Sequence, residues 1–242
     1  MNNMKGRPLS IENRWDILYR DYPEVYDEFA NVPYEPRMID VLNDIFDFSG
    51  KKIADIGSGS GRSTLLLAEF AEHVIGVEPE NVMRDEALKN TEEAGVTNIV
   101  YVDGRGENIP LEDESVDMVV AITATMYPPE EVIPLFIAEA RRVVKSGGVI
   151  VSVDVAPGWY GGELSWVIED PDADIDLRAK HRCFVDDAGF DYFDIIQTSH
   201  YGNLKKIIST YGFIFGVKVI KYIKENNITS IKWVFRAYYT KK

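Results

Sequence analysis

The feature that most constrains the fold is a glycine-rich turn between two apolar segments, in the stretch "KIADIGSGSGRSTLLLAEF". The segment 52–56 is typical of a strand, and 63–71 is typical of a helix. Between them Gly57, Gly59 and Gly61 alternate with other residues. Glycine costs backbone entropy and adds no side chain to a core, so this turn indicates a need for bare main chain. A tight turn that lets a ligand approach the backbone, at the carboxyl end of a strand, meets that need.

The rest of the chain alternates short β-branched runs with helical patterns, which is the signature of parallel βαβ construction. We predict a doubly wound, Rossmann-like α/β sheet of seven strands, mostly parallel. After the first strand, the predicted strands lie at 74–78, 99–103, 116–122, 149–155, 189–199 and 230–239. Helices are predicted from Asn81 to about 95, from the two prolines at 128–129 to about 145, where "SGG" ends the helix, and at about 175–188.

Two regions depart from this alternation. The segment 156–174 reads as a long loop that carries Trp159, Tyr160 and Trp166, and long loops are often functional. The N-terminal residues 1–45 read as a helical lid, followed by one domain over 46–242 with a helical insertion near 202–226. The aromatic stretch 211–215 of that insertion is interpreted as core, a face of a homodimer or a cap on a pocket.

Composition limits the partners. The 242 residues carry 26 Lys plus Arg against 40 Asp plus Glu, a formal charge of −14, so an acidic surface would repel nucleic acid. Cys183 is the only cysteine, which excludes an intrachain disulfide and a cysteine-based zinc site, and no metal-ligand cluster is apparent. Because neither a signal peptide nor a membrane span is recognisable, we expect a cytoplasmic protein without a membrane partner.

Acidic residues near the predicted strand ends indicate a nucleoside-containing cofactor. Glu78 lies 21 residues after Gly57, at the end of the second predicted strand, where a carboxylate can accept hydrogen bonds from ribose hydroxyls. The glycine spacing does not match the dinucleotide pattern G-x-G-x-x-G. Asp55, two residues before Gly57, suits an ammonium group better than a pyrophosphate. These features favour S-adenosylmethionine, which carries an α-amino group and no phosphate.

Four segments in order resemble the motifs of class I S-adenosylmethionine-dependent methyltransferases. They are "IADIGSGSGRST", "VIGVEPE", "YVDGRGENIPLEDESVDMVVA" and "FIAEARRVVKSGGVIVSVD". The resemblance covers about residues 35–200 and implies a seventh strand that runs antiparallel. It also implies a set of cofactor contacts. These are Gly57, Ser58 and Gly59 for the methionine part, Glu78 for the ribose, Pro79, Asp103 and Gly104 for the adenine, Ala121 and Ile122 beside the sulfonium, and Tyr19 and Tyr26 in an aromatic lid, with Asp55 and Gly61 as further cofactor-binding residues.

The sequence identifies no unmistakable catalytic residue. Tyr127, after the fourth strand, and His200, after the sixth, are the candidates. The text "AITATMYPP" lacks the Asn/Asp-Pro-Pro-aromatic motif of enzymes that methylate nucleic-acid amino groups, which disfavours that reaction. We therefore predict methyl transfer to a small-molecule acceptor. Methylation of a protein or an RNA, a non-catalytic cofactor-binding subunit, and an NAD-dependent oxidoreductase stay open as alternatives.

Overall fold

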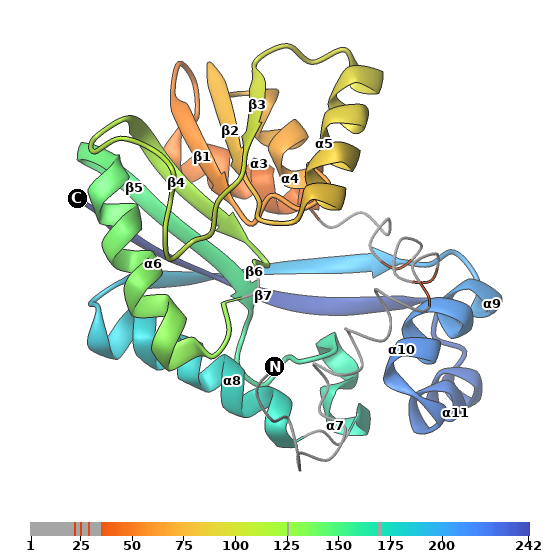
Figure 1. Ribbon diagram of the computed structural model, residues 1–242. Helices are drawn as coiled ribbons and strands as arrows, with labels where there is room; N and C mark the ends of the chain where they lie inside the picture. The colour runs from red at the N-terminus through yellow and green to blue at the C-terminus, as the bar shows by residue number, and fades with distance from the viewer. Residues whose placement is uncertain (1–21, 23–24, 26–28, 30–34, 125, 169–170) are drawn as a thin grey trace, which may run out of the picture. The chain divides into compact units, whose positions relative to one another are not determined.

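The structure is a computed structural model that describes Tyr22, Val25, Phe29 and residues 35–242 except 125, 169 and 170 (Figure 1). Contacts between Cα atoms divide the chain into two compact units. Unit 1 consists of Met1–Tyr34, Pro157–Leu177 and Ile196–Val234, and unit 2 of Glu35–Ala156, Arg178–Ile195 and Phe235–Lys242. Tyr19 and Tyr26 of the predicted lid lie outside the described residues, and the predicted division into lid and domain stays a prediction.

Seven strands form one mixed sheet in the order β3-β2-β1-β4-β5-β7-β6. Strands β1 to β5 pair in parallel and β7 pairs antiparallel with β5. This confirms the predicted fold class. The strands are β1 (Lys52–Ile56), β2 (His73–Val77), β3 (Ile99–Val102), β4 (Val116–Ile122), β5 (Val144–Val155), β6 (Asp191–His200) and β7 (Ser230–Lys241).

Helices cover both faces of the parallel strands in unit 2, so β1, β2 and β4 are mostly buried and largely apolar, whereas the edge strand β3 is partly exposed. Helix α6 (Pro129–Val143) lies on one face, and α4 (Arg62–Ala68) and α5 (Asn81–Ala94) lie on the other (Figure 1). Helix α6 buries Phe136 and Ala140. Its first turn is acidic and its last turn carries Arg141 and Arg142, which complements the helix dipole. Helix α3 (Glu35–Phe46) precedes β1.

The boundary between α6 and β5 differs from the prediction. The helix ends at Val143, and the strand begins at once with Val144, which pairs with Val116. The register shifts between Val116 and Met118, so the glycines that follow lie inside an irregular strand. A Cβ on Gly148 would lie 2.6 Å from the carbonyl oxygen of Asp117. The glycines therefore let β5 pass close to β4 and do not end the helix.

Several other boundaries also differ from the prediction. Strands β2 and β3 end one residue early, so Glu78 and Asp103 follow the strands. The helix predicted at 175–188 is α8 (Pro171–His181) continued by a π-helical segment, η2 (Arg182–Asp187). The predicted loop at 156–174 contains two short helices, η1 (Gly162–Leu164) and α7 (Ser165–Ile168).

The predicted insertion near 202–226 forms four short helical segments of unit 1. They are α9 (Leu204–Ile207), η3 (Ile208–Gly212), α10 (Phe213–Phe215) and α11 (Val217–Asn226). Tyr211 is fully buried, and its ring contacts those of Phe215 and Trp233. Most of the stretch 211–215 is therefore core, which is one of the three roles that the sequence left open for it.

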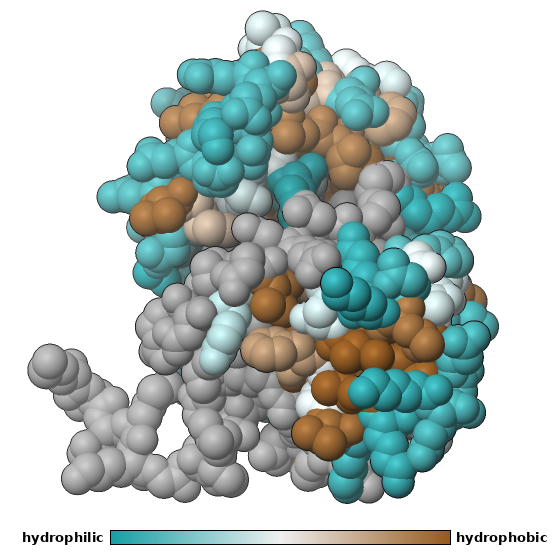
Figure 2. Space-filling view, turned by 90° about the vertical axis from the view of Figure 1, so that its right-hand side faces the viewer, coloured by the Kyte–Doolittle hydropathy of each residue, from teal (hydrophilic) through white to brown (hydrophobic). Residues whose placement is uncertain are grey.

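Phe213 and Val217 are exposed. Figure 2 shows apolar side chains in the lower half of that view, bordered by hydrophilic ones.

Candidate functional site

The glycine turn joins β1 to α4 and is anchored to β2. Gly57, Gly59 and Gly61 have φ values of +72°, +53° and +85°, in the region that favours glycine. The Gly57 N–H donates to the carbonyl oxygen of Val77 over 2.8 Å. Gly61 is the left-handed residue directly before the first turn of α4. The turn therefore takes a shape that other residues would adopt only with strain.

The three glycines face different surroundings. A Cβ on Gly57 would lie 2.8 Å from the Cβ of Ala124, and one on Gly61 would collide with the Tyr101 hydroxyl. A Cβ on Gly59 would meet nothing closer than the Met83 Cε at 3.6 Å. Close packing within the protein therefore accounts for Gly57 and Gly61, whereas a Cβ on Gly59 would make only an ordinary van der Waals contact with Met83.

Asp55 ends a buried polar cluster behind the turn. Its side chain is 1% exposed, and its Oδ2 accepts from Ser63 Oγ at 2.9 Å and from Thr64 Oγ1 at 2.7 Å. Its Oδ1 is buried without a hydrogen-bond partner, as is Ser58 Oγ. Burial raises the pKa of Asp55 to about 6, although the two hydroxyls oppose this shift. Two buried oxygens of the cluster, Asp55 Oδ1 and Ser58 Oγ, could therefore each form a hydrogen bond with a ligand.

Glu78 is held rigidly just beyond β2. Its carboxylate accepts from the N–H of Gly59 and from the N–H of Glu80, each at 3.0 Å. The side chain is 7% exposed. The bond to Gly59 joins the glycine turn to the end of β2, so the first two strand ends form one preorganised unit.

Arg84 on α5 links the end of β2 to the end of β3. Its Nη1 donates to the Glu78 carbonyl oxygen at 2.6 Å and pairs with Asp103 at 3.4 Å. The Asp103 side chain is 74% exposed, so this ion pair is weak. Pro79 and Gly104 are half-buried beside these acids, and Pro110 fills the space that a Gly104 side chain would need. Sequence reasoning missed Arg84, although its place one helical turn into α5 was a usable signal.

Other predicted site residues are spread along the chain. Ala121 and Ile122 end β4 and are buried. Tyr127 is 36% exposed and precedes Pro128 through a cis peptide bond. His200 ends β6 within unit 1 and is exposed. In the described part of the chain, no group of three or more His, Cys, Asp or Glu side chains could hold a metal ion.

Comparison with known proteins identifies the family. The family described as "Methyltransferase domain" matches residues 54–152. A methyltransferase of Geobacillus sp. is 30% identical over 153 residues, which cover 61% of this chain and 67% of that protein. This chain belongs to the S-adenosylmethionine-dependent methyltransferases. Their cofactor, S-adenosylmethionine, is therefore the cofactor of this enzyme.

Two further similarities extend this result. A phosphoethanolamine N-methyltransferase of Caenorhabditis elegans is 29% identical over 150 residues, covering 60% of this methyltransferase and 30% of that protein. The crystal structure of a methyltransferase from Aquifex aeolicus aligns with a TM-score of 0.59 and 15% identity, covering 90% of this chain and 97% of that one. The structural match supports the fold alone. Within the described residues, no helix is both long and apolar enough to cross a membrane.

Proposed function

We propose that this methyltransferase transfers the methyl group of S-adenosylmethionine to a small-molecule acceptor, and that the glycine turn and the ends of β1 to β4 hold the cofactor. The observation that carries the location is the pair of buried, unpartnered oxygens, Asp55 Oδ1 at the end of β1 and Ser58 Oγ in the glycine turn. A buried polar atom without a partner is costly, so native sites supply one. The amino acid portion of the cofactor carries an ammonium group, which would donate to Asp55 Oδ1, and a carboxylate, which would accept from the Ser58 hydroxyl.

The remaining residues suit the rest of the cofactor. The fixed carboxylate of Glu78 would accept from the two ribose hydroxyls, since its lone pairs exceed the two N–H donors that it already binds. Pro79 would contact the adenine, while Asp103 and the Gly104 N–H would bind its polar edge. Arg84 pairs with Asp103 through Oδ1 alone, which leaves the other carboxylate oxygen to accept from the adenine amine. Ala121 and Ile122 would border the sulfonium.

The chemistry asks little of the protein beyond orientation. When bound, the sulfonium supplies an electrophilic methyl group: an acceptor lone pair forms a bond to the carbon while the carbon–sulfur pair returns to sulfur. Rigid placement of the cofactor and partial removal of water provide most of the acceleration. An amine acceptor needs no strong base, whereas a hydroxyl acceptor needs one. Tyr127 and His200 stay the candidates for that role.

A small acceptor is favoured by charge. The chain is strongly acidic, which disfavours an RNA substrate. The C. elegans relative is named for a small amine substrate. These observations support the proposal, and a protein acceptor stays an alternative.

Calorimetric titration with S-adenosylmethionine tests the cofactor site. We expect the Glu78→Ala variant to bind about 10- to 100-fold more weakly, because a charge-assisted pair of hydrogen bonds to the ribose is lost. The affinity of the Glu78→Gln variant should lie between those of the wild type and Glu78→Ala. The matched control is Glu80→Ala, which removes an exposed carboxylate two residues away and keeps the main-chain N–H that binds Glu78. Unchanged affinity in a folded Glu78→Ala protein would overturn this site.

A further inference from the structure

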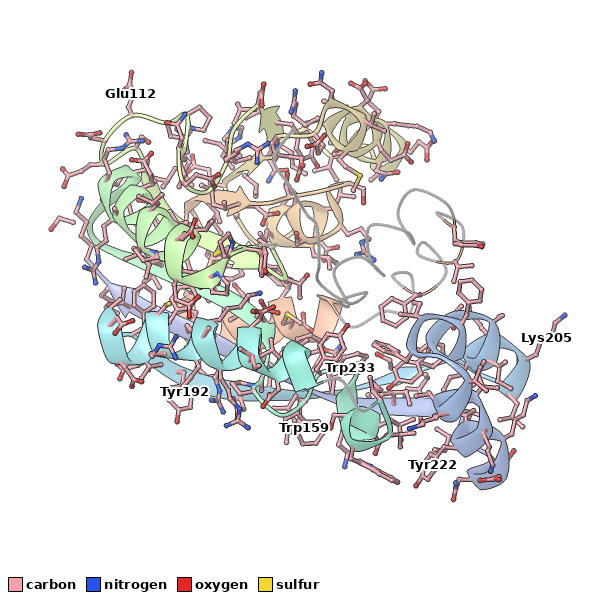
Figure 3. All side chains as sticks on the ribbon, turned by 60° about the horizontal axis from the view of Figure 1, so that its bottom comes forward. Glu112, Trp159, Tyr192, Lys205, Tyr222 and Trp233 are labelled. Carbon is pink, nitrogen blue, oxygen red and sulfur yellow. The ribbon has the colours of Figure 1, made fainter. Side chains whose placement is uncertain are left out.

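Unit 1 contains a cavity of about 440 Å³ that is separate from the proposed cofactor site. Its walls come from η1 and α7 on one side, and from the end of α11 and the first residue of β7 on the other. All of these segments belong to unit 1, and α7 packs against α11, on which Figure 3 labels Tyr222. Small-molecule sites typically measure about 300–1,000 Å³, so the cavity is large enough for a ligand.

Backbone hydrogen bonds fix the wall that follows α11. Asn227 ends the helix in the left-handed conformation with φ +51°, and its N–H is bonded back to the last turn. The carbonyl oxygen of Thr229 accepts from the N–H of Tyr201 at 2.9 Å. The side-chain nitrogen of Asn226 donates to the Tyr222 carbonyl oxygen at 2.9 Å, which leaves the amide oxygen to accept from a ligand. This wall is therefore preorganised and polar.

Two aromatic rings of the lining stand nearly perpendicular to each other. The ring centroids of Trp166 and Tyr222 lie 5.0 Å apart, with an angle of 84° between the ring planes. Trp166 is 64% exposed, although tryptophan side chains are highly buried on average. The faces of such rings carry negative partial charge and attract cations. An exposed indole at the cavity therefore offers a surface to a positively charged ligand.

Glu163 is the one charged side chain among the described residues that line the cavity. Its Oε1 accepts from the Lys232 N–H at 2.8 Å, and no basic side chain in the described part of the chain forms an ion pair with it. Lys221 of α11 lies outside the lining and pairs with Glu225. The hydrogen bond orients the Glu163 carboxylate, whose other oxygen can face a ligand. The cavity therefore combines a carboxylate with aromatic ring faces.

We propose that this cavity binds a small organic ammonium ion that carries alkyl groups. The alkyl groups bring the positive charge against the ring faces, and the Glu163 carboxylate supplies the opposite charge. The amides and hydroxyls within residues 226–230 suit a polar group attached to such an ion. An anionic ligand is disfavoured, because no basic side chain of the described residues lines the cavity. This site lies within unit 1, and the proposal does not depend on cofactor binding.

The first test compares choline with 3,3-dimethyl-1-butanol, which has the same shape but carries carbon in place of the charged nitrogen. In a proton NMR titration of the full-length protein, the choline methyl signal should shift upfield because the methyl groups lie over ring faces. Choline should bind about tenfold or more tightly than the neutral compound. Equal affinities would overturn the proposal, because the cavity would then recognise shape alone. Binding of glucose in the absence of choline binding would overturn it as well.

Variants assign the binding to this cavity. Glu163→Gln removes the charge and keeps an oxygen for the Lys232 N–H, so choline should bind about 3- to 10-fold more weakly. Trp166→Leu removes the exposed ring and should weaken choline binding by about fivefold or more. The matched control is Glu225→Gln, which changes the charge of the same unit equally but lies outside the lining, and should leave choline binding unchanged.

The Glu163→Gln variant decides the outcome even if Trp166→Leu fails to fold, because glutamine preserves the shape of the side chain and its bond to the main chain. Circular dichroism verifies that each variant is folded. Unchanged choline affinity in folded Glu163→Gln, or equal weakening in Glu225→Gln, would contradict the proposal. The first result would remove the carboxylate from the site, and the second would mean that choline responds only to the overall charge.

Discussion

At the scale of single residues, Asp55 in the proposed cofactor site destabilises the ligand-free protein and offers a free oxygen to a ligand. Asp55 accepts two hydroxyl hydrogen bonds through Oδ2, yet its Oδ1 has no partner. Two hydrogen bonds do not offset full burial of a carboxylate, so its pKa rises from 3.8 to about 6. The ionised Asp55 carboxylate therefore lowers the free energy of unfolding, and a ligand ammonium bound to it would reduce this penalty.

The pH dependence of this cost can be predicted in sign and size. Because the pKa is raised on folding, the native state binds the proton more tightly, and the penalty is complete above pH 6 and absent below about 3.8. We expect Asp55→Asn to increase the free energy of unfolding at pH 7.5 by up to about 3 kcal/mol, with a gain that shrinks between pH 6 and pH 4. Urea unfolding across this range measures the difference.

The same variant should bind S-adenosylmethionine about tenfold more weakly, since the charge partner of the ammonium is removed. A stability gain that does not vary with pH would contradict the assignment of the raised pKa to Asp55. The matched control is Asp47→Asn, because Asp47 is exposed and its pKa is lowered by hydrogen bonds from Ser49.

At the scale of secondary-structure elements, Tyr101 on β3 determines how the glycine turn packs. Tyr101 pairs in register with Gly76 on β2, and its ring fills the space that side chains at Gly76 and Gly61 would need. Its hydroxyl lies 3.1 Å from Thr91 Oγ1 on α5. One aromatic ring thus contacts β2, β3, the glycine turn and α5. Its packing explains why glycine occupies positions 61 and 76, where a side chain would collide with it.

Comparing alanine substitutions at Gly61 and Gly50 distinguishes the effect of collision with Tyr101 from the effect of backbone strain. In Gly61→Ala we expect a loss of about 2–4 kcal/mol in the free energy of unfolding, from a positive φ and from collision with Tyr101. Gly50→Ala is the matched control: its φ is +66°, but nothing lies within 4 Å of the added Cβ, so only about 1–2 kcal/mol should be lost. Chemical denaturation measures both.

Adding Tyr101→Phe should recover part of the loss in Gly61→Ala, since the colliding hydroxyl is removed while Cζ stays at 3.2 Å. A double-mutant cycle gives this coupling directly. Equal losses in the two alanine variants would show that Tyr101 does not constrain the turn.

These contacts also show what the sequence could and could not predict. The strands were found because runs such as 116–122 are apolar throughout, which depends on local residues only. The carboxylates near strand ends followed from the same periodicity. The roles of Tyr101 and Thr64 depend on register between strands and on helix rotation, which bring Tyr101 to Gly61, 40 residues away, and Thr64 to Asp55, 9 residues away, without a local signal. For Arg84 the local signal was its place one helical turn into α5, and its contact with Asp103, 19 residues away, could not be read from it. The α6–β5 boundary was wrong for the same reason, because pairing with Val116 overrode the glycine signal.

At the scale of the whole molecule, the charge of −14 is unevenly distributed along the chain. The segment 196–234 contains six lysines and one glutamate, so the rest of the chain carries 20 basic against 39 acidic residues. The rest includes every residue proposed to contact the cofactor. A predominantly negative field attracts cations and repels anions over roughly 10 Å at 0.1 M salt.

This field should distinguish the cofactor from its product. S-adenosylmethionine carries a net charge of about +1 at neutral pH from its sulfonium, ammonium and carboxylate, whereas S-adenosylhomocysteine is neutral overall because it lacks the sulfonium charge. Raising the salt concentration from about 20 mM to about 500 mM should therefore weaken cofactor binding several-fold and change product binding little. Calorimetric titrations of both compounds at the two salt concentrations measure this. Equal weakening of the two would mean that the acidic field does not reach the site, and that local contacts alone select the charged form.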